Sequence, residues 1–353
     1  MRKMNNIAIL YQAQCPPSID GVQKPMKPGG YSDSGADIAF QLIKNNIDVL
    51  TPIKNPNLNL DKDWVFPDTK NGIELALNHG ANIFWLNTVL YKNHPIESFL
   101  DRGIEIVGQI PETVGVFDDK MVTNNLLKSN QIPIPKNELI TSTNFNDLSL
   151  DFPLVLKPIR GRGSQGVTKI DSQNELIACL NKLFSEGTFG NLAYVEPFLN
   201  GQEITITVMP KGNYIINNTE EFFSRPWCLP AVKRFNHNNG IAPYNGVVAV
   251  MENSEVLSDD ELLTNEIQEV YKHCIKAAEL IEIKAPIRID CRANKQGKYF
   301  LFDLNMKPNM TGPSRPHRKN QDSLTLLSAR KIGWNYFDLL SNILNLKWKA
   351  SDK

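Results

Sequence analysis

An apolar run that ends at a lysine and continues into a glycine-rich turn is the first stretch that could do chemistry. The run, FPLVLKPIRGRGSQGV, covers residues 152–167 and places Lys157 just before three glycines. Glycine has no Cβ, so backbone N–H groups in such a turn can approach phosphate oxygens closely. Lys157, Arg160 and Arg162 add positive charge for the same ligand. The stretch matches neither the P-loop nor GxGxxG, and taken alone it favours an ordinary basic hairpin.

Acidic residues on two neighbouring predicted strands could bind a divalent cation. Asp290 lies in IRIDCR, and Asp303 and Asn305 lie in FLFDLN. Alternate strand residues share a face, so Asp303 and Asn305 lie together, and Asp290 can face them if the strands pair. These oxygen ligands suit Mg²⁺, with Mn²⁺ as an alternative, bridged to the phosphates of ATP. Solvated acidic residues are the alternative, but Asp303 stands in an apolar run where an unpaired charge would be costly.

Three further charged residues lie beside these motifs. Arg288 is two residues before Asp290, where it could stabilise charge on a transferred phosphate or form an ordinary salt bridge. Glu196 and Glu203 flank residues 197–199 at the end of a predicted strand. This segment could be a hinge whose backbone pairs with adenine while an acid holds the ribose hydroxyls. A polar turn at a sheet edge is the alternative.

Composition limits the classes of function. The chain has 353 residues, of which 41% are apolar and 22% charged, which predicts a globular protein of two or three domains. Lys plus Arg and Asp plus Glu both total 38, so the overall charge favours neither nucleic acid nor a membrane surface. We find no signal peptide and no apolar run long enough to span a bilayer. The five cysteines show no CxxC spacing, which predicts free thiols in a reducing cytoplasm.

Alternating strand and helix patterns predict a Rossmann-like α/β domain with a parallel sheet at the start of the chain. No GxGxxG opens its first helix, so dinucleotide binding is not supported. The expected strands are 6–11, 47–52, 81–87 and 103–108, with helices beginning at Ser34, over 72–78 and near 95–100.

From residue 116 onward the pattern changes to mixed strands and helices. The segment 224–246 is long and irregular, which indicates a functional or mobile loop. The other expected elements are a helix carrying Lys120, strands after 133–135, over 152–157 and 191–199, a strand pair in 202–218, a helix over 173–184, a helix over 259–281, strands 285–293 and 298–305, and helices 323–332 and 336–343.

The order of these motifs resembles the ATP-grasp superfamily, and most of all its D-alanine–D-alanine ligase branch. The matching features run from Lys120 and Lys157 through the hinge at 196–203 to Arg288–Asp290 and Asp303–Asn305. The resemblance implies a pre-ATP-grasp domain over 1–115, a central lid subdomain over 116–198 and a C-terminal catalytic subdomain over 199–353. Two α+β subdomains would grip ATP between them.

The resemblance also implies roles for individual residues. Phosphates would contact Lys120, Lys157, Arg162, Gly163, Ser164, Gly166 and Lys233; adenosine would contact Glu196, Phe198, Leu199 and Glu203; Mg²⁺ would be held by Asp290, Asp303 and Asn305; and catalysis would use Arg288, Lys157, Ser314 and Asn309. A carboxylate would attack the γ-phosphate to form an acyl phosphate, and an amine would then displace phosphate. The protein would position the reactants and neutralise charge.

The sequence departs from the ligase pattern where the acceptor binds. Lys307 and Asn309 replace small residues there, and Ser314 falls where the family has a carboxylate-binding serine. Arg315 and Arg318 follow, and they could capture a substrate carboxylate or phosphate or belong to a solvated basic helix start. These departures leave D-alanine unsupported as the substrate.

The N-terminal domain lacks the histidine–glycine–acid signature of the family. His94 could orient the first substrate, although a lone histidine is more often structural. Lys24 and Lys27 could help to bind an acid.

These features together predict an ADP-forming carboxylate–amine ligase of the cytoplasm. Its substrates would be a small carboxylic acid, such as an amino acid, and an amine, and we expect a homodimer without nucleic-acid or membrane partners. One alternative is a ligase that forms an ester with a hydroxy acid. The other is a sensor that binds ATP without turnover, which the retained metal ligands argue against.

Overall fold

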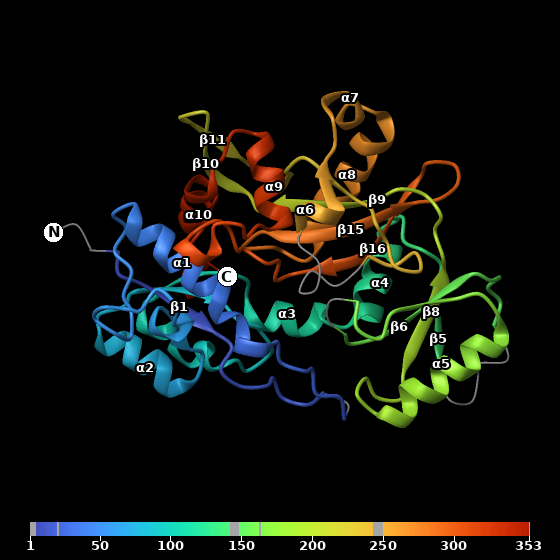
Figure 1. Ribbon diagram of the computed structural model, residues 1–353, viewed down its shortest axis with the longest axis horizontal. Coiled ribbons are helices and arrows are strands. Elements are labelled where there is room, and N and C mark those ends of the chain that lie inside the picture. Colours follow the sequence, from blue (N-terminus) through green and yellow to red (C-terminus); the bar gives the residue numbers. More distant parts are fainter. Residues whose placement is uncertain (1–4, 20, 142–147, 162–163, 243–249, 353) are drawn as a thin grey trace.

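The computed structural model describes residues 5–352 except 20, 142–147, 162–163 and 243–249. Three sheets of four or six strands, with covering helices, lie in three parts of the molecule: the N-terminal part, a small central unit and the C-terminal part (Figure 1). A fourth sheet among the described residues is a two-stranded hairpin. The predicted combination of an N-terminal parallel sheet with a two-part ATP-grasp fold is confirmed. No helix among the described residues is both long and apolar enough to cross a membrane.

The N-terminal sheet is parallel and has the strand order β2-β1-β3-β4. Its inner strands are apolar on both faces because both faces are covered. The strands are β1 (Ile7–Tyr11), β2 (Phe66–Pro67), β3 (Ile83–Asn87) and β4 (Glu105–Val107), and the main helices are α1 (Ser32–Lys44) and α2 (Lys70–Asn78), with a 3₁₀ helix over Pro95–Arg102.

Two details of this domain differ from the prediction. The expected strand over 47–52 forms only one bridge, between Val49 and Ile7, because the following Pro52 has no N–H to continue the ladder. Strand β2 takes its place beside β1. Helix α1 begins at Ser32 rather than after Ser34, whose hydroxyl donates to the carbonyl oxygen of Tyr31 at 3.1 Å.

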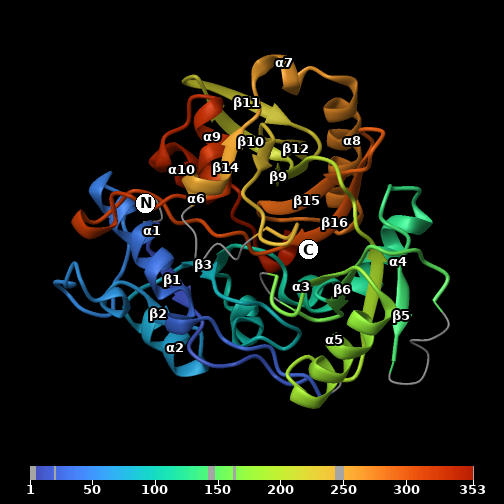
Figure 2. The same ribbon diagram turned by 45° about the vertical axis from the view of Figure 1, so that its right-hand side comes forward.

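The central unit contains an antiparallel sheet of order β5-β8-β6-β7 and the helix α5 (Gln173–Glu186), which covers one face (Figure 2). Its core is separate from the rest of the protein and includes Leu154, Leu156, Leu180 and Val195. The strands are β5 (Glu138–Ile140), β6 (Leu154–Pro158), β7 (Thr168–Ile170) and β8 (Ala193–Pro197).

The C-terminal sheet has six strands in the order β14-β13-β9-β15-β16, with β12 also pairing with β9. The hairpin β10–β11 and the helices α8, α9 and α10 surround it (Figure 1). The strands are β9 (Glu203–Met209), β10 (Gly212–Ile216), β11 (Thr219–Phe223), β12 (Trp227–Cys228), β13 (Val232–Arg234), β14 (Ser254–Val256), β15 (Ile287–Ala293) and β16 (Tyr299–Asn305). The helices of this part and of the connection before the central unit are α3 (Pro111–Phe117), α4 (Lys120–Ser129), α6 (Val250–Asn253), α7 (Asp259–Leu262), α8 (Asn265–Leu280), α9 (Leu324–Lys331) and α10 (Tyr336–Asn345).

Two predictions for this part were wrong in detail. The strand pair in 202–218 does not form, because every residue of β9 is buried and the strand lies between β13 and β15 instead. Strand β10 pairs with β11. The single helix over 259–281 is split into α7 and α8, since Thr264 has extended backbone at the N-cap of α8.

The N-terminal and C-terminal parts share their hydrophobic cores. One cluster joins Leu10 of β1 and Ile106 of β4 to Ile289 of β15, and it also contains Leu127 of α4. Backbone bonds of 2.8 and 2.9 Å connect Ile106 with Trp348 in both directions. These two parts therefore form one large body, with the central unit attached to it.

Candidate active site

The predicted pairing of the two acidic strands is confirmed. Strands β15 and β16 are antiparallel neighbours that place Asp290 opposite Asp303 and Arg288 opposite Asn305. The guanidinium of Arg288 donates from Nε and Nη2 to the two oxygens of Asp290 at 3.1 and 3.0 Å. Thr205 Oγ1 donates to the same carboxylate at 2.7 Å. Asp290 is therefore fixed by Arg288 of its own strand and by Thr205 of the neighbouring strand β9.

Lys120 lies in the first turn of α4 and forms an ion pair with Asp303. The side chain of Asp119 caps this helix by accepting from the N–H groups of Met121 and Val122. Burial alone would raise the pKa of Asp303, but the charge and hydrogen bond of Lys120, together with the charges of Lys157 and Arg288, outweigh it, and the pKa lies below the ordinary value. Asp303 is therefore ionised at neutral pH and ready to hold positive charge.

Lys157 projects from β6 and forms a buried ion pair with Glu196 of the adjacent strand β8. Its ammonium also lies 3.3 Å from the carbonyl oxygen of Phe302, which comes from the C-terminal sheet. Burial raises the pKa of Glu196, and the nearby charge of Lys157 offsets this only in part. The two lysines thus reach the same region from different elements.

The chain after β8 connects the central unit to β9, at the place where the sequence predicted a hinge. The N–H of Phe198 donates to Pro153 O at 2.9 Å, and the guanidinium of Arg292 lies 4.6 Å from the centre of its ring. Glu203 contacts His237 Nε2 at 2.9 Å and Arg292 Nη1 at 3.4 Å. The ring of Phe198 and the carboxylate of Glu203 therefore both contact the guanidinium of Arg292.

One pocket is lined both by these groups and by residues of the N-terminal domain and of the segment after β16. It runs from the hinge past both lysines and the acidic strands to residues of the N-terminal domain. Among the described residues it is lined by Lys27, Tyr31, Lys120, Val155, Lys157, Pro158, Gly161, Ser164, Gln165, Val167, Glu196, Pro197, Phe198, Leu199, Glu203, Arg234, Ile241, Ala242, Arg288, Asp290, Arg292, Phe302, Asp303, Asn305, Lys307 and Asn309.

The glycine-rich turn reaches the pocket only in part. Ser164 lines the pocket, and its hydroxyl donates to Ala242 O at 3.4 Å. Gly166 has a φ of +72° and packs against the ring of Phe189, so its position depends on glycine, but it does not line the pocket. Arg162 and Gly163 lie outside the described residues.

Lys233, which we expected at the phosphates, does not reach the pocket. Its ammonium lies 3.2 Å from Glu255 Oε2, on the neighbouring strand β14. Strand residues alternate between faces, and the next residue, Arg234, lines the pocket instead. The strand was too short and irregular in sequence for its phase to be predicted.

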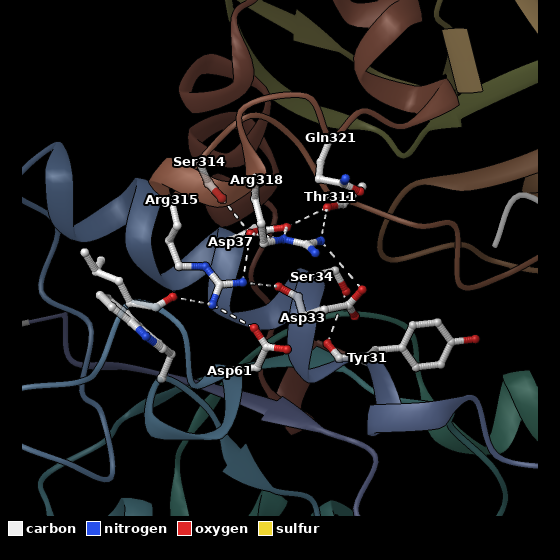
Figure 3. Close-up of polar contacts among 12 residues, drawn as sticks. Tyr31, Asp33, Ser34, Asp37, Asp61, Thr311, Ser314, Arg315, Arg318 and Gln321 are labelled. Carbon is white, nitrogen blue, oxygen red and sulfur yellow. Dashed lines mark hydrogen bonds and ion pairs between the residues drawn. The ribbon is translucent and has the colours of Figure 1, made fainter. Parts of the chain in front are cut away.

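Ser314, Arg315 and Arg318 also lie away from the pocket lining. All three donate to the buried carboxylate of Asp37 on α1, at 2.5, 3.1 and 2.8 Å (Figure 3). Arg315 is fully buried and pairs with Asp61 as well, at 2.7 Å. The geometry therefore favours a structural role for these residues, between α1 and the segment that follows β16.

His94 likewise is buried outside the pocket lining. Its Nδ1 accepts the N–H of Ile96 at 3.3 Å, and its Nε2 lies 3.3 Å from Asp68 Oδ2. Asp68 also accepts the N–H of Ala13 at 2.9 Å. These contacts favour the structural alternative for the histidine.

Several residues of the site were not predicted from the sequence. Arg292 and His237 contact Glu203, and Arg234 lines the pocket, but the sequence does not show which basic residues reach the acids. The alternation Arg288, Asp290, Arg292 along β15 could have indicated Arg292, because alternate residues share a face.

Known proteins resemble this chain in sequence. The family model described as "D-ala D-ala ligase C-terminus" matches residues 126–345, more than half of the chain. The D-alanine–D-alanine ligase of Francisella philomiragia is 24% identical over 69% of this chain and 71% of its own. That of Actinobacillus succinogenes is 25% identical over 71% of this chain and 75% of its own.

Solved structures show the same fold. The D-alanine–D-alanine ligase of Bacillus anthracis superposes with a TM-score of 0.67 at 19% identity, covering 96% of each chain. The VanG D-Ala:D-Ser ligase of Enterococcus faecalis superposes with a TM-score of 0.64 at 14% identity, covering 97% of this chain and 99% of its own. On the strength of the family model, this chain belongs to the D-alanine–D-alanine ligase family, as the motif order predicted.

Proposed function

We propose that this chain activates a small carboxylic acid as an acyl phosphate and couples it to an amine, giving an amide or dipeptide with ADP and phosphate. Family membership identifies it as an ATP-dependent ligase. The observation that carries the proposal is the convergence of Lys120, Lys157 and the Asp290–Asp303 pair on one pocket. A ligase needs these groups to bind a triphosphate and to neutralise its charge.

ATP would lie with its adenosine at the hinge and its phosphates between the two lysines. We assign the adenine to the backbone near Phe198 and Leu199, and the ribose to Glu203, which lines the pocket beside them. A structure of the Bacillus anthracis ligase with ATP, which superposes with a TM-score of 0.62, supports ATP as the nucleotide. Phosphate oxygens would become additional partners of Lys157 and Lys120.

The donor set of the acidic strands fits a divalent cation. Asp290, Asp303 and Asn305 offer hard oxygens, and both carboxylates already neutralise a basic side chain, Arg288 or Lys120. These three residues would hold Mg²⁺, or alternatively Mn²⁺. The ion would supply positive charge to the phosphates during transfer.

The chemistry then depends on positioning. The carboxylate oxygen of the acid attacks the γ-phosphorus as its bond to ADP breaks, and the amine nitrogen next attacks the acyl carbon as phosphate leaves. Arg288 lines the pocket with its guanidinium held by Asp290, where it would stabilise the charge on the transferred group. Asn309 also lines the substrate side, whereas nothing in the geometry supports a catalytic role for Ser314.

The remaining expectations concern the setting of the enzyme. Five free cysteines support a reducing location such as the cytoplasm. The division at residues 116 and 199 and the homodimer stay predictions. Since Leu127 of α4 lies in the large core, we place the start of the central unit nearer β5.

The test is a measurement of ADP formation from Mg-ATP with paired panels of small acids and amines, followed by mass analysis of the products. We expect turnover that needs both substrates and a condensed product. Asp303→Asn should reduce turnover by about a hundredfold or more, because charge stabilisation in the transition state is lost. Asp259→Asn, on the exposed start of α7, is the control and should retain full activity.

Other outcomes point elsewhere. A condensed product only with hydroxy acids would identify an ester-forming ligase. Nucleotide binding without ADP formation under any pair would overturn the proposal in favour of a sensor.

A further inference from the structure

The part of the pocket that borders the N-terminal domain contains a lysine, Lys307, that contacts two side chains of that domain. The ammonium of Lys307 lies 3.5 Å from the centre of the Tyr31 ring. It also donates to Asn87 Oδ1 at 3.3 Å. Lys307 follows β16 by two residues, so it lies next to the proposed metal ligand Asn305. A positive charge is thus presented beside the reacting phosphates.

The orientation of Asn87 is fixed by its other contacts. Its Nδ2 donates to Tyr31 O at 2.9 Å and to Ser34 Oγ at 3.1 Å, and the side chain is buried. The amide oxygen must therefore face Lys307. Tyr31 is held in turn by the preceding Gly30, where a Cβ would lie only 1.8 Å from Gln12 O.

A second lysine lies at the same end. Lys27 lines the pocket, and its ammonium lies 5.1 Å from the same Tyr31 ring. It contacts Asp33 at 3.2 Å, but Asp33 does not line the pocket. Both ammonium groups therefore lie against one aromatic ring, which concentrates positive charge at this end.

The acidic side chains of the pocket are engaged elsewhere. Each of the four acids among its described lining residues contacts at least one basic side chain. The pairs are Glu196 with Lys157, Glu203 with His237 and Arg292, Asp290 with Arg288, and Asp303 with Lys120. The lysine end is therefore suited to an anion and poorly suited to the ammonium group of an amino acid.

We propose that Lys307, with Lys27, binds a second carboxylate of the acid that ATP activates. The activated substrate is then a small dicarboxylic acid rather than a neutral α-amino acid. This inference rests on the proposed function and specifies its substrate class. Lys307 would determine which acid is bound, because its ammonium lies in the pocket wall between the end of β16, which carries two proposed metal ligands, and the N-terminal domain.

The test compares acids of equal length that differ by one carboxylate. Calorimetry would measure the binding of succinate and butyrate, and of glutarate and pentanoate, to the full chain with a non-hydrolysable ATP analogue and Mg²⁺. We expect the dicarboxylates to bind about tenfold or more tightly, as one charged hydrogen bond provides. Lys307→Met should bring the ratio close to one. Lys211→Met, in the exposed turn before β10, should leave it unchanged.

Two results would overturn the inference. One is equal binding, or no binding, of dicarboxylates to the unaltered protein, and the other is an unchanged preference in Lys307→Met. Measurement of ADP formation with the same acids and an amine panel keeps the two proposals apart. Turnover with butyrate as good as with succinate refutes only the dicarboxylate, whereas a carboxylate preference in binding without any turnover refutes only the ligase reaction.

Discussion

Different interactions stabilise the large body and the central unit. In the large body, the N-terminal and C-terminal parts share continuous hydrophobic cores and a buried ionic network centred on Asp37. The central unit has its own small core and touches the body through polar contacts such as Lys157 with Phe302 O. The difference teaches that the proposed metal ligands lie on the large body, whereas Lys157 lies on a unit that has a separate core.

The largest expected effect is a loss of stability when the ionic network of Asp37, which connects the N-terminal and C-terminal parts, is broken. Arg315→Met would leave Asp37 buried with less compensation and should lower the free energy of unfolding by about 3–5 kcal/mol. Urea denaturation would measure it. Arg225→Met removes an exposed ion pair with Glu279 and should cost about 1 kcal/mol or less. Equal losses in the two variants would show that the Asp37 network does not hold the body together.

A smaller and local effect is expected in the central unit. Leu180→Ala removes a buried side chain from the core under α5 and should destabilise that unit by about 2–4 kcal/mol. Hydrogen exchange should accelerate in β5 to β8 and stay unchanged in β9 and β15, because the cores are separate. Leu192→Ala, at a partly exposed position, is the control. Equal acceleration in the large body would contradict the division.

The smallest expected effect is a difference between the two regions in how the free energy of unfolding depends on pH. The pKa of Asp303 in the body is lowered, so its stabilising effect is full above the ordinary value of 3.8 and is lost as pH falls through the folded pKa. The pKa of Glu196 in the central unit is raised, so stability falls as pH rises from 4.5 through the folded pKa. Unfolding free energies of Asp303→Asn and Glu196→Gln, subtracted from those of the unaltered chain across pH 2–7, should change in opposite directions. Parallel curves would contradict these opposite shifts.

Much of the geometry of the candidate site was predictable because its acidic residues lie on two neighbouring strands. Asp290, Asp303 and Asn305 alternate within apolar runs, so period-two geometry brought them together correctly. The position of Lys157 near the end of a strand, β6, was also predicted. The parallel N-terminal sheet followed from its buried strands, whereas the two-residue strand β2 carried too little pattern to be found.

The residues that connect distant segments could not be predicted in the same way. Arg315 and Arg318 are residues that could bind a substrate carboxylate or phosphate. Only the packing of α1 shows that both guanidinium groups donate to Asp37 instead. Lys233 and Arg234 are adjacent, and the sequence does not show which of them faces the pocket. Such assignments depend on the phase of short strands and on partners more than two hundred residues away.

The bridge between Ile106 and Trp348 has a consequence for behaviour at high concentration. Strand β4 is the outer strand of the parallel sheet, and an open outer strand can recruit strands from other molecules. Trp348 pairs with Ile106 from the open side and also donates from its indole to Gly108 O at 2.8 Å. This residue therefore shields the edge against aggregation, a task independent of catalysis.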